Sequence, residues 1–234
     1  MVLSDSYCGV PMWQRFARAL SPSRFALAAL AACAACGAQQ RIAAPAPQTR
    51  ADIRDAEAAE RSRRHDLARI RYESAIARAK DRASVAFARS RFGETLLTWG
   101  EYAEGIAQLA ASVASYPDDP QPWHNLGLAL QHTGDLHRAL EAFERARSLV
   151  PNDWRPRISL AALKWSLAAR CFRGPGPHDS CSTRVAATQQ EYRALLALDL
   201  PRPLREKVRW ALQQLELPNA GLRADVVTQL RAWR

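Results

Sequence analysis

Small and apolar residues between positions 120 and 151 recur with the spacing of two short helices joined by a tight turn. The first helix carries on one face four residues spaced by three, one and three positions: Trp123, Leu126, Gly127 and Leu130. This period of about 3.6 residues predicts an amphipathic helix, and Gly134-Asp135 predicts the turn after it. The second helix carries on one face Ala139, Leu140, Phe143 and Ala146, and we expect it to end before Pro151.

The same pattern recurs 34 positions earlier in the chain. The three pairs at this offset are Gly93 with Gly127, Gly100 with Gly134, and Pro117 with Pro151. Because the chain has only 10 glycines and 14 prolines, three matches at one offset indicate an internal repeat. An ordinary helical-hairpin bundle is the alternative interpretation.

The order of these residues resembles the tetratricopeptide repeat, a 34-residue unit with the pattern W-x2-L-G-x2-Y, A-x3-F and P. Trp123, Leu126, Gly127, Ala139, Phe143, Ala146 and Pro151 fit this pattern, and Leu130 replaces the tyrosine. The resemblance implies an all-α solenoid of tetratricopeptide-type helical hairpins. We expect this solenoid to have capping helices and to follow a flexible N-terminal signal and linker. It also implies a concave groove that takes extended peptides or helices.

The resemblance and the local composition together divide the chain into seven segments. Residues 51–85 form a basic helical region, which is either a degenerate repeat or an isolated helix that covers the end of the stack. The other segments are a signal segment with a lipobox-like end (1–33), an Ala/Pro linker expected to be extended (34–50), two repeats (86–119 and 120–153), a divergent repeat with an insert at 171–181 (154–201), and capping helices (202–234).

The N-terminal segment has the layout of a secretory signal. Three arginines precede an apolar run over 25–32, which is far shorter than the roughly 20 residues of a membrane-spanning helix. The sequence Leu30-Ala31-Ala32-Cys33 resembles the lipobox of bacterial lipoproteins, which implies acylation of Cys33 and an outer-membrane lipoprotein that faces the periplasm. Cys36 is the competing acylation site, Met12 is an alternative start, and an uncleaved alanine-rich helix is the alternative to a signal.

Composition narrows the choice of partners. The apolar share of 48% and the charged share of 24% are ordinary for a soluble globular protein. The net charge of +10 comes almost entirely from arginine, but it is dispersed and is not interleaved with aromatic residues. We therefore expect no nucleic-acid partner and no small-molecule substrate, and we expect another protein as the partner.

Candidate catalytic and metal-binding residues are scarce. The chain has no nucleophile elbow, zinc-protease motif, phosphate loop or calcium loop, so we expect no enzyme activity, no cofactor and no metal. His124, His132 and His137 are interpreted as exposed residues of a helical repeat. Cys171 and Cys181 flank a turn-rich loop and predict a disulfide in an oxidising compartment. Free thiols, or a metal site that adds His178, are the alternatives.

The resemblance assigns a binding groove to the face of each first helix that points away from its partner helix. Ten residues are predicted to line it: Phe87, Ser90, Glu94, Leu97, Gln121, His124, Leu128, Gln131, Arg155 and Ile158. One subfamily clamps a partner's terminal carboxylate there, and Asn125 and Arg155 match parts of that clamp. Ser90 and Glu94 stand where its first lysine and asparagine belong, so we reject the clamp.

These observations predict a non-enzymatic scaffold or adaptor, anchored at Cys33 and acting in envelope, pilus or secretion assembly. A cytoplasmic tetratricopeptide regulatory protein is one alternative. An accessory factor of a cell-wall enzyme, attracted to anionic polymer by the positive charge, is another.

Overall fold

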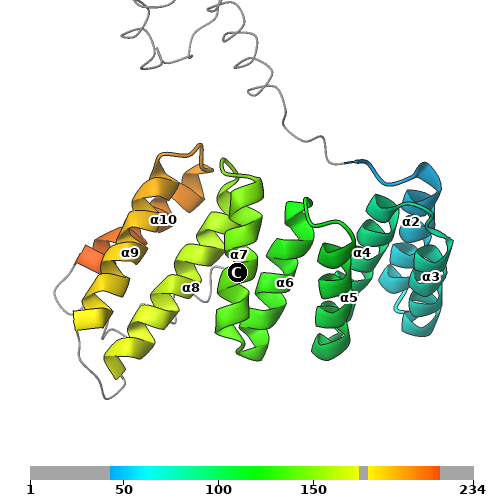
Figure 1. The fold of residues 1–234 in the computed structure, drawn as a ribbon, viewed down its shortest axis with the longest axis horizontal. Coiled ribbons are helices and arrows are strands. Elements are labelled where there is room, and N and C mark those ends of the chain that lie inside the picture. Colours follow the sequence, from blue (N-terminus) through cyan, green and yellow to red (C-terminus); the bar gives the residue numbers. More distant parts are fainter. Residues whose placement is uncertain (1–42, 174–178, 217–234) are drawn as a thin grey trace, which may run out of the picture. The chain divides into compact units, whose positions relative to one another are not determined.

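A computed structural model describes residues 43–173 and 179–216 of the chain, and this part is helical (Figure 1). The signal segment, Cys33, His178 and the last expected helix lie outside the described residues. The helices are α2 (Pro47–Arg61), α3 (His65–Arg78), α4 (Arg82–Trp99), α5 (Tyr102–Ser115), α6 (Pro120–Thr133), α7 (Leu136–Leu149), α8 (Trp154–Arg173), α9 (Asp179–Leu196) and α10 (Arg202–Glu216).

Consecutive helices pack as hairpins, namely α2 with α3, α4 with α5, α6 with α7, and α8 with α9, while α10 packs against α9. Each hairpin contacts the next, as Figure 1 shows for the ribbon. The first helices of the hairpins also contact one another, α2 with α4, α4 with α6 and α6 with α8. We call these four helices the inner row. The expected fold class, an all-α solenoid of tetratricopeptide-type hairpins, is confirmed.

Local sequence explains where the helices begin and end. The carboxylate of Asp81 accepts the Ser84 backbone N–H at 2.8 Å, and Asp119 and Asp135 cap α6 and α7 in the same way. Gly100 and Gly134 end α4 and α6 with φ of 85° and 89°, a left-handed conformation that residues with a Cβ rarely adopt. The turns that the two glycines predict therefore form where the 34-residue offset puts them.

The helices of a hairpin approach closely where a side chain is missing. A Cβ built on Gly127 would lie 2.6 Å from two ring carbons of Phe143, whose side chain is fully buried. A Cβ on Gly93 would lie 2.8 Å from Cγ of Leu109 and 3.1 Å from the carbonyl oxygen of Gly105. Both glycines thus mark equivalent contacts in successive hairpins.

Two helix boundaries differ from the expectation. α2 begins at Pro47, inside the stretch expected to be an extended linker, because proline is tolerated in a first helical turn. The backbone N–H of Ala46 donates to Ser84 Oγ at 2.8 Å and ties this start to α4. α8 extends to Arg173 and α9 starts at Asp179, so both helices run into the segment expected to be a loop.

The described helices bury three apolar clusters. Two of them are shared by neighbouring hairpins, and the third lies between the α8–α9 hairpin and α10. Within residues 43–173 and 179–216, no helix is long and apolar enough to cross a membrane.

Candidate functional site

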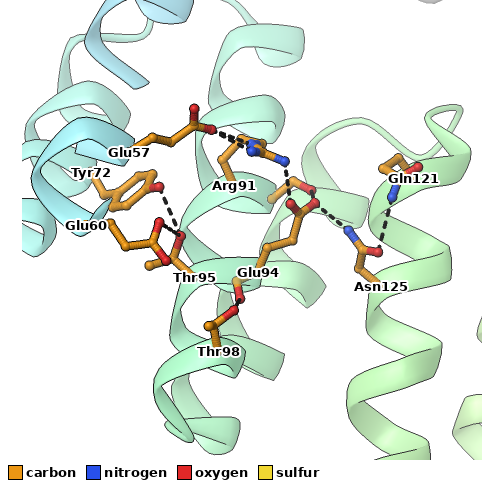
Figure 2. A network of polar contacts seen from close by, with 10 residues as sticks. Glu57, Glu60, Tyr72, Arg91, Glu94, Thr95, Thr98, Gln121 and Asn125 are labelled. Atoms are coloured by element: carbon orange, nitrogen blue, oxygen red, sulfur yellow. Dashed lines mark hydrogen bonds and ion pairs between the residues drawn. The ribbon is translucent and has the colours of Figure 1, made fainter. Parts of the chain in front are cut away.

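The inner row carries a chain of polar contacts that links three hairpins (Figure 2). The Arg91 guanidinium on α4 donates to Glu57 Oε1 on α2 at 2.9 and 2.5 Å, and to Glu94 Oε2 at 2.5 Å. Glu94 also accepts a short hydrogen bond from the Asn125 amide on α6. Asn125 in turn accepts from Gln121 Nε2 at 3.2 Å. The contacts therefore join α2, α4 and α6 through side chains alone.

Glu94 is the central residue of these polar contacts, and burial is the largest influence on its charge. Burial raises the pKa of its carboxyl, against the opposing effects of the Arg91 charge and of the hydrogen bonds from Ser90 and Asn125. A carboxylate that is desolvated to this degree depends on each of its donors, because an unpaired buried charge is costly. Glu94 is thus a structural link between repeats as well as part of the inner surface.

A second polar contact in the same region is buried. The hydroxyls of Tyr72 on α3 and Thr95 on α4 lie 2.9 Å apart, and burial raises the pKa of Tyr72 to about 12. Thr95 also donates to Glu60 of α2 at 3.4 Å. These residues attach the first hairpin to the second beneath the Glu57–Arg91 pair, as Figure 2 shows.

His124 connects the inner row further along, from α6 to α8. Its Nε2 lies 3.0 Å from Ser159 Oγ, and its ring centroid lies 5.7 Å from that of Phe143. Burial lowers the pKa of the imidazole. This histidine therefore lies between helices, in contrast to the exposed position expected for it.

The other two histidines of the second repeat are exposed, as expected. His132 stacks on Tyr102 with 4.3 Å between ring centroids, and His137 Nδ1 lies 3.3 Å from Glu141. Among the described residues, no group of three or more His, Cys, Asp or Glu side chains could hold a metal.

The predicted groove residues fall into different environments. The apolar ones, Phe87, Leu97, Leu128 and Ile158, are half-buried and pack against the core clusters. Ser90 is 4% exposed and donates to Glu94 at 3.4 Å, so little of it faces solvent. A Cβ added at Gly105 would meet Leu97 Cδ2 at 2.8 Å, which shows that Leu97 covers that glycine. The structure therefore leaves only part of the predicted lining accessible.

The polar members that remain are spread along the row. Gln121 is exposed at the start of α6, and Gln131 lines a hollow at the end of that helix. Arg155 is exposed, lies 3.3 Å from Asp153 and packs over the Trp154 ring at 5.7 Å. Glu94 and Asn125, where a carboxylate clamp would bind its ligand, are bonded to each other.

Cys171 and Cys181 form a disulfide, with 5.5 Å between their Cα atoms. The bond joins the last turn of α8 to the first turn of α9. It leaves neither thiol for the alternative metal site with His178.

The sequence interpretation missed Glu57 and Arg91. A signal was present, because residues 57, 91 and 125 follow one another at the 34-residue offset and so occupy equivalent positions in successive inner helices. An arginine between a glutamate and an asparagine at equivalent positions predicts polar contacts from one repeat to the next.

The sequence model of the tetratricopeptide repeat family matches residues 120–153. No curated protein sequence matches the chain closely enough to count as a relative. Among solved structures, a form of MamA from MSR-1 is similar at 15% identity and a TM-score of 0.51, over 79% of this chain and 95% of that one. YrrB, described as a tetratricopeptide protein with an unusual peptide-binding site, is similar at 16% identity and a TM-score of 0.51, over 77% and 85%. Residues 120–153 are thus a tetratricopeptide repeat, in a chain with the tetratricopeptide-type fold.

Proposed function

We propose that this chain, a tetratricopeptide protein by fold, is a non-enzymatic scaffold that binds a segment of another protein along the inner row. The observation that carries the proposal is the inner row itself, in which four helices contact one another and carry half-buried apolar side chains beside polar ones. Such a surface suits a peptide, because apolar patches contribute burial and amides pair with a peptide backbone. The peptide-binding site of YrrB, which shares the fold, is consistent with this use of it.

We further propose that the protein acts in the bacterial envelope, held to the outer membrane by an acylated Cys33. This part depends on the sequence, on the arginines and apolar run before Leu30-Ala31-Ala32-Cys33. A disulfide between Cys171 and Cys181 suits an oxidising compartment. Mass spectrometry of the membrane fraction tests the anchor, since an acylated Cys33 supports it and an intact Met1 or Met12 terminus indicates the cytoplasmic alternative.

A photo-crosslinking experiment tests the binding surface. A photoreactive amino acid at Gln121, which is exposed on α6, reports on the inner row. The same amino acid at Ser148, exposed on α7, serves as the matched control on a second helix. We expect position 121 to capture a protein that position 148 does not capture, and identical patterns at both positions would refute the proposal.

A mutation that should block binding to the inner row extends the same test. Leu128→Glu adds a charge to the inner row, and we expect it to abolish the crosslink from position 121. Because Leu128 also packs against the core, a thermal melt must establish that the variant is folded, and Arg155→Glu at an exposed position of the predicted groove provides a second variant. The cell-wall alternative predicts instead that binding to isolated sacculi is lost with salt and is insensitive to Leu128→Glu.

A further inference from the structure

A hollow of about 310 Å³ lies between the end of α6, the start of α7 and the second half of α8. Its lining residues are Gln131, His132, Gly134, Leu136, Leu163, Ser166 and Arg170. Only Gln131 belongs to the predicted groove, so the hollow extends the candidate site beyond the positions that the repeat pattern indicates.

The hollow depends on an irregularity of this chain. α6 ends at Thr133, and the equivalent position one repeat later is 167, but α8 continues to Arg173. The additional turns bring Arg170 beside the α6–α7 turn at Gly134. The next residue, Cys171, is bonded to Cys181, and this disulfide constrains the backbone next to Arg170.

The charges around the hollow favour an anion. Arg170 is the one lysine or arginine among the lining residues, and none of them is acidic. The Arg170 guanidinium is exposed and makes no ion pair or hydrogen bond with another described residue. The nearby carboxylate of Asp135 is paired with Arg138 at 3.3 Å.

The remaining groups define what kind of anion fits. The Gln131 side-chain amide makes no hydrogen bond to another described residue, so it is available as a second donor. The Ser166 hydroxyl donates to the Ala162 carbonyl oxygen at 3.0 Å, and His132 stacks on a tyrosine. Leu136 and Leu163 contribute apolar surface. One planar guanidinium, one amide and an apolar wall suit a singly charged planar group, whereas a doubly charged phosphate favours more than one cation.

We propose that this hollow binds a carboxylate of the partner polypeptide, with Arg170 as the charged donor and Gln131 as the neutral one. The carboxylate belongs either to the partner's C-terminus or to an aspartate or glutamate side chain. The proposal rests on the proposed function, because it names one chemical group of the segment that the inner row receives.

Short peptides distinguish the two sources and test the site directly. In ¹H–¹⁵N NMR titrations of the full chain with its disulfide intact, the probes are Ac-Ala-Ala-Ala-OH and Ac-Ala-Glu-Ala-NH2. We expect saturable shifts of the Arg170 Nε–H and the Gln131 side-chain amide with at least one probe. The neutral peptide Ac-Ala-Gln-Ala-NH2 should cause none, and whichever charged peptide binds identifies the source of the carboxylate.

Variants establish that Arg170 is responsible. Arg170→Gln should weaken binding about ten- to a hundredfold, as expected for loss of a charge-assisted hydrogen bond. Arg170→Lys should weaken binding less, because the positive charge stays but the planar arrangement of guanidinium N–H donors is lost. Arg184→Gln on α9, also exposed and absent from the hollow, is the matched control and should bind as the unmodified protein does.

Three results would overturn the proposal: no shift with either charged peptide, equal binding by Arg170→Gln, or shifts with inorganic phosphate in place of the peptides. The outcome is separable from that of the proposed function. If neither charged peptide binds while crosslinking from position 121 succeeds, the carboxylate site in the hollow is refuted and the proposed scaffold function stands. If the peptides bind while crosslinking fails, the carboxylate site stands and the scaffold is wrong.

Discussion

Gly127→Ala is the substitution that most directly tests how the hairpins are packed. A Cβ at this position would lie 2.6 Å from Cδ1 and Cε1 and 3.0 Å from Cζ of Phe143, where ordinary contacts are 3.4–4 Å. The ring is rigid and its side chain is fully buried, so it cannot rotate away into solvent. Either the ring or the whole of α7 must therefore move by about 1 Å, the difference between these distances.

Two opposing terms decide the size of the effect. Overpacking of a buried site costs about 1–3 kcal/mol, and the rigid ring places this site near the upper end. Alanine favours a helix interior by about 1 kcal/mol relative to glycine, which offsets part of that cost. We expect a net loss of about 2 kcal/mol in the free energy of unfolding, or a fall of about 4–8 °C in the melting temperature.

Urea unfolding followed by circular dichroism measures the change, with two control variants. Gly105→Ala places its Cβ 2.8 Å from Cδ2 of Leu97, the far end of a flexible side chain, but also 3.1 Å from the carbonyl oxygen of Gly93, so it should cost less than Gly127→Ala without being neutral. Phe143→Leu removes the ring carbons that meet the Cβ, so Gly127→Ala should cost much less in that background. An unchanged cost in the Phe143→Leu background, or no cost in the unmodified chain, would refute the close contact.

Three further outcomes follow from particular contacts. Asn125→Ala removes an amide donor from the half-buried Glu94 carboxylate and should cost about 1–3 kcal/mol in urea unfolding. A change below about 0.5 kcal/mol, roughly the scatter of surface substitutions, would contradict that role. Burial lowers the pKa of His124 in the folded state below the unfolded value of 6.5. The free energy of unfolding should therefore fall as the pH is lowered from 6.5 towards the folded pKa. Thermal melts at a series of pH values measure this dependence, and His124→Asn should remove it. Replacing Cys171 and Cys181 with serine should cost about 2.5–3 kcal/mol by the loop-entropy relation, and an unchanged unfolding midpoint would contradict it.

The fold was accessible from sequence because its determinants are local and periodic. Gly127 and Phe143 are required at fixed positions by close helix packing, and Gly134 is required by a left-handed turn. The weaker first hairpin, α2 with α3, was left open because it lacks the tryptophan and glycine signals. It packs around Ile53 of α2 and Tyr72 of α3. Only the second of these positions follows the repeat pattern, since Ala68, Tyr72 and Ala75 have the spacing of Ala139, Phe143 and Ala146.

The candidate site was only partly accessible. A helical period assigns residues to a face, but it does not say whether neighbouring side chains on that face bond to each other. Glu94 shows the difference, because its carboxylate is taken up by Arg91 and Asn125, which come from positions 34 apart in successive repeats. The pattern indicates the surface, and the contacts between repeats decide which groups remain for a partner.

The hollow beside Arg170 illustrates the opposite limit. It arises where the chain departs from its period, since α8 continues past the position at which α6 ends. A comparison of repeats at the fixed offset of 34 residues treats the additional helical turns of α8 as an insertion. It therefore assigns their residues to no face of the solenoid. Equivalent positions of the inner row already differ from repeat to repeat, as Glu57, Arg91 and Asn125 show. The departure from the period adds a further difference, because only one end of a bound segment could reach the hollow.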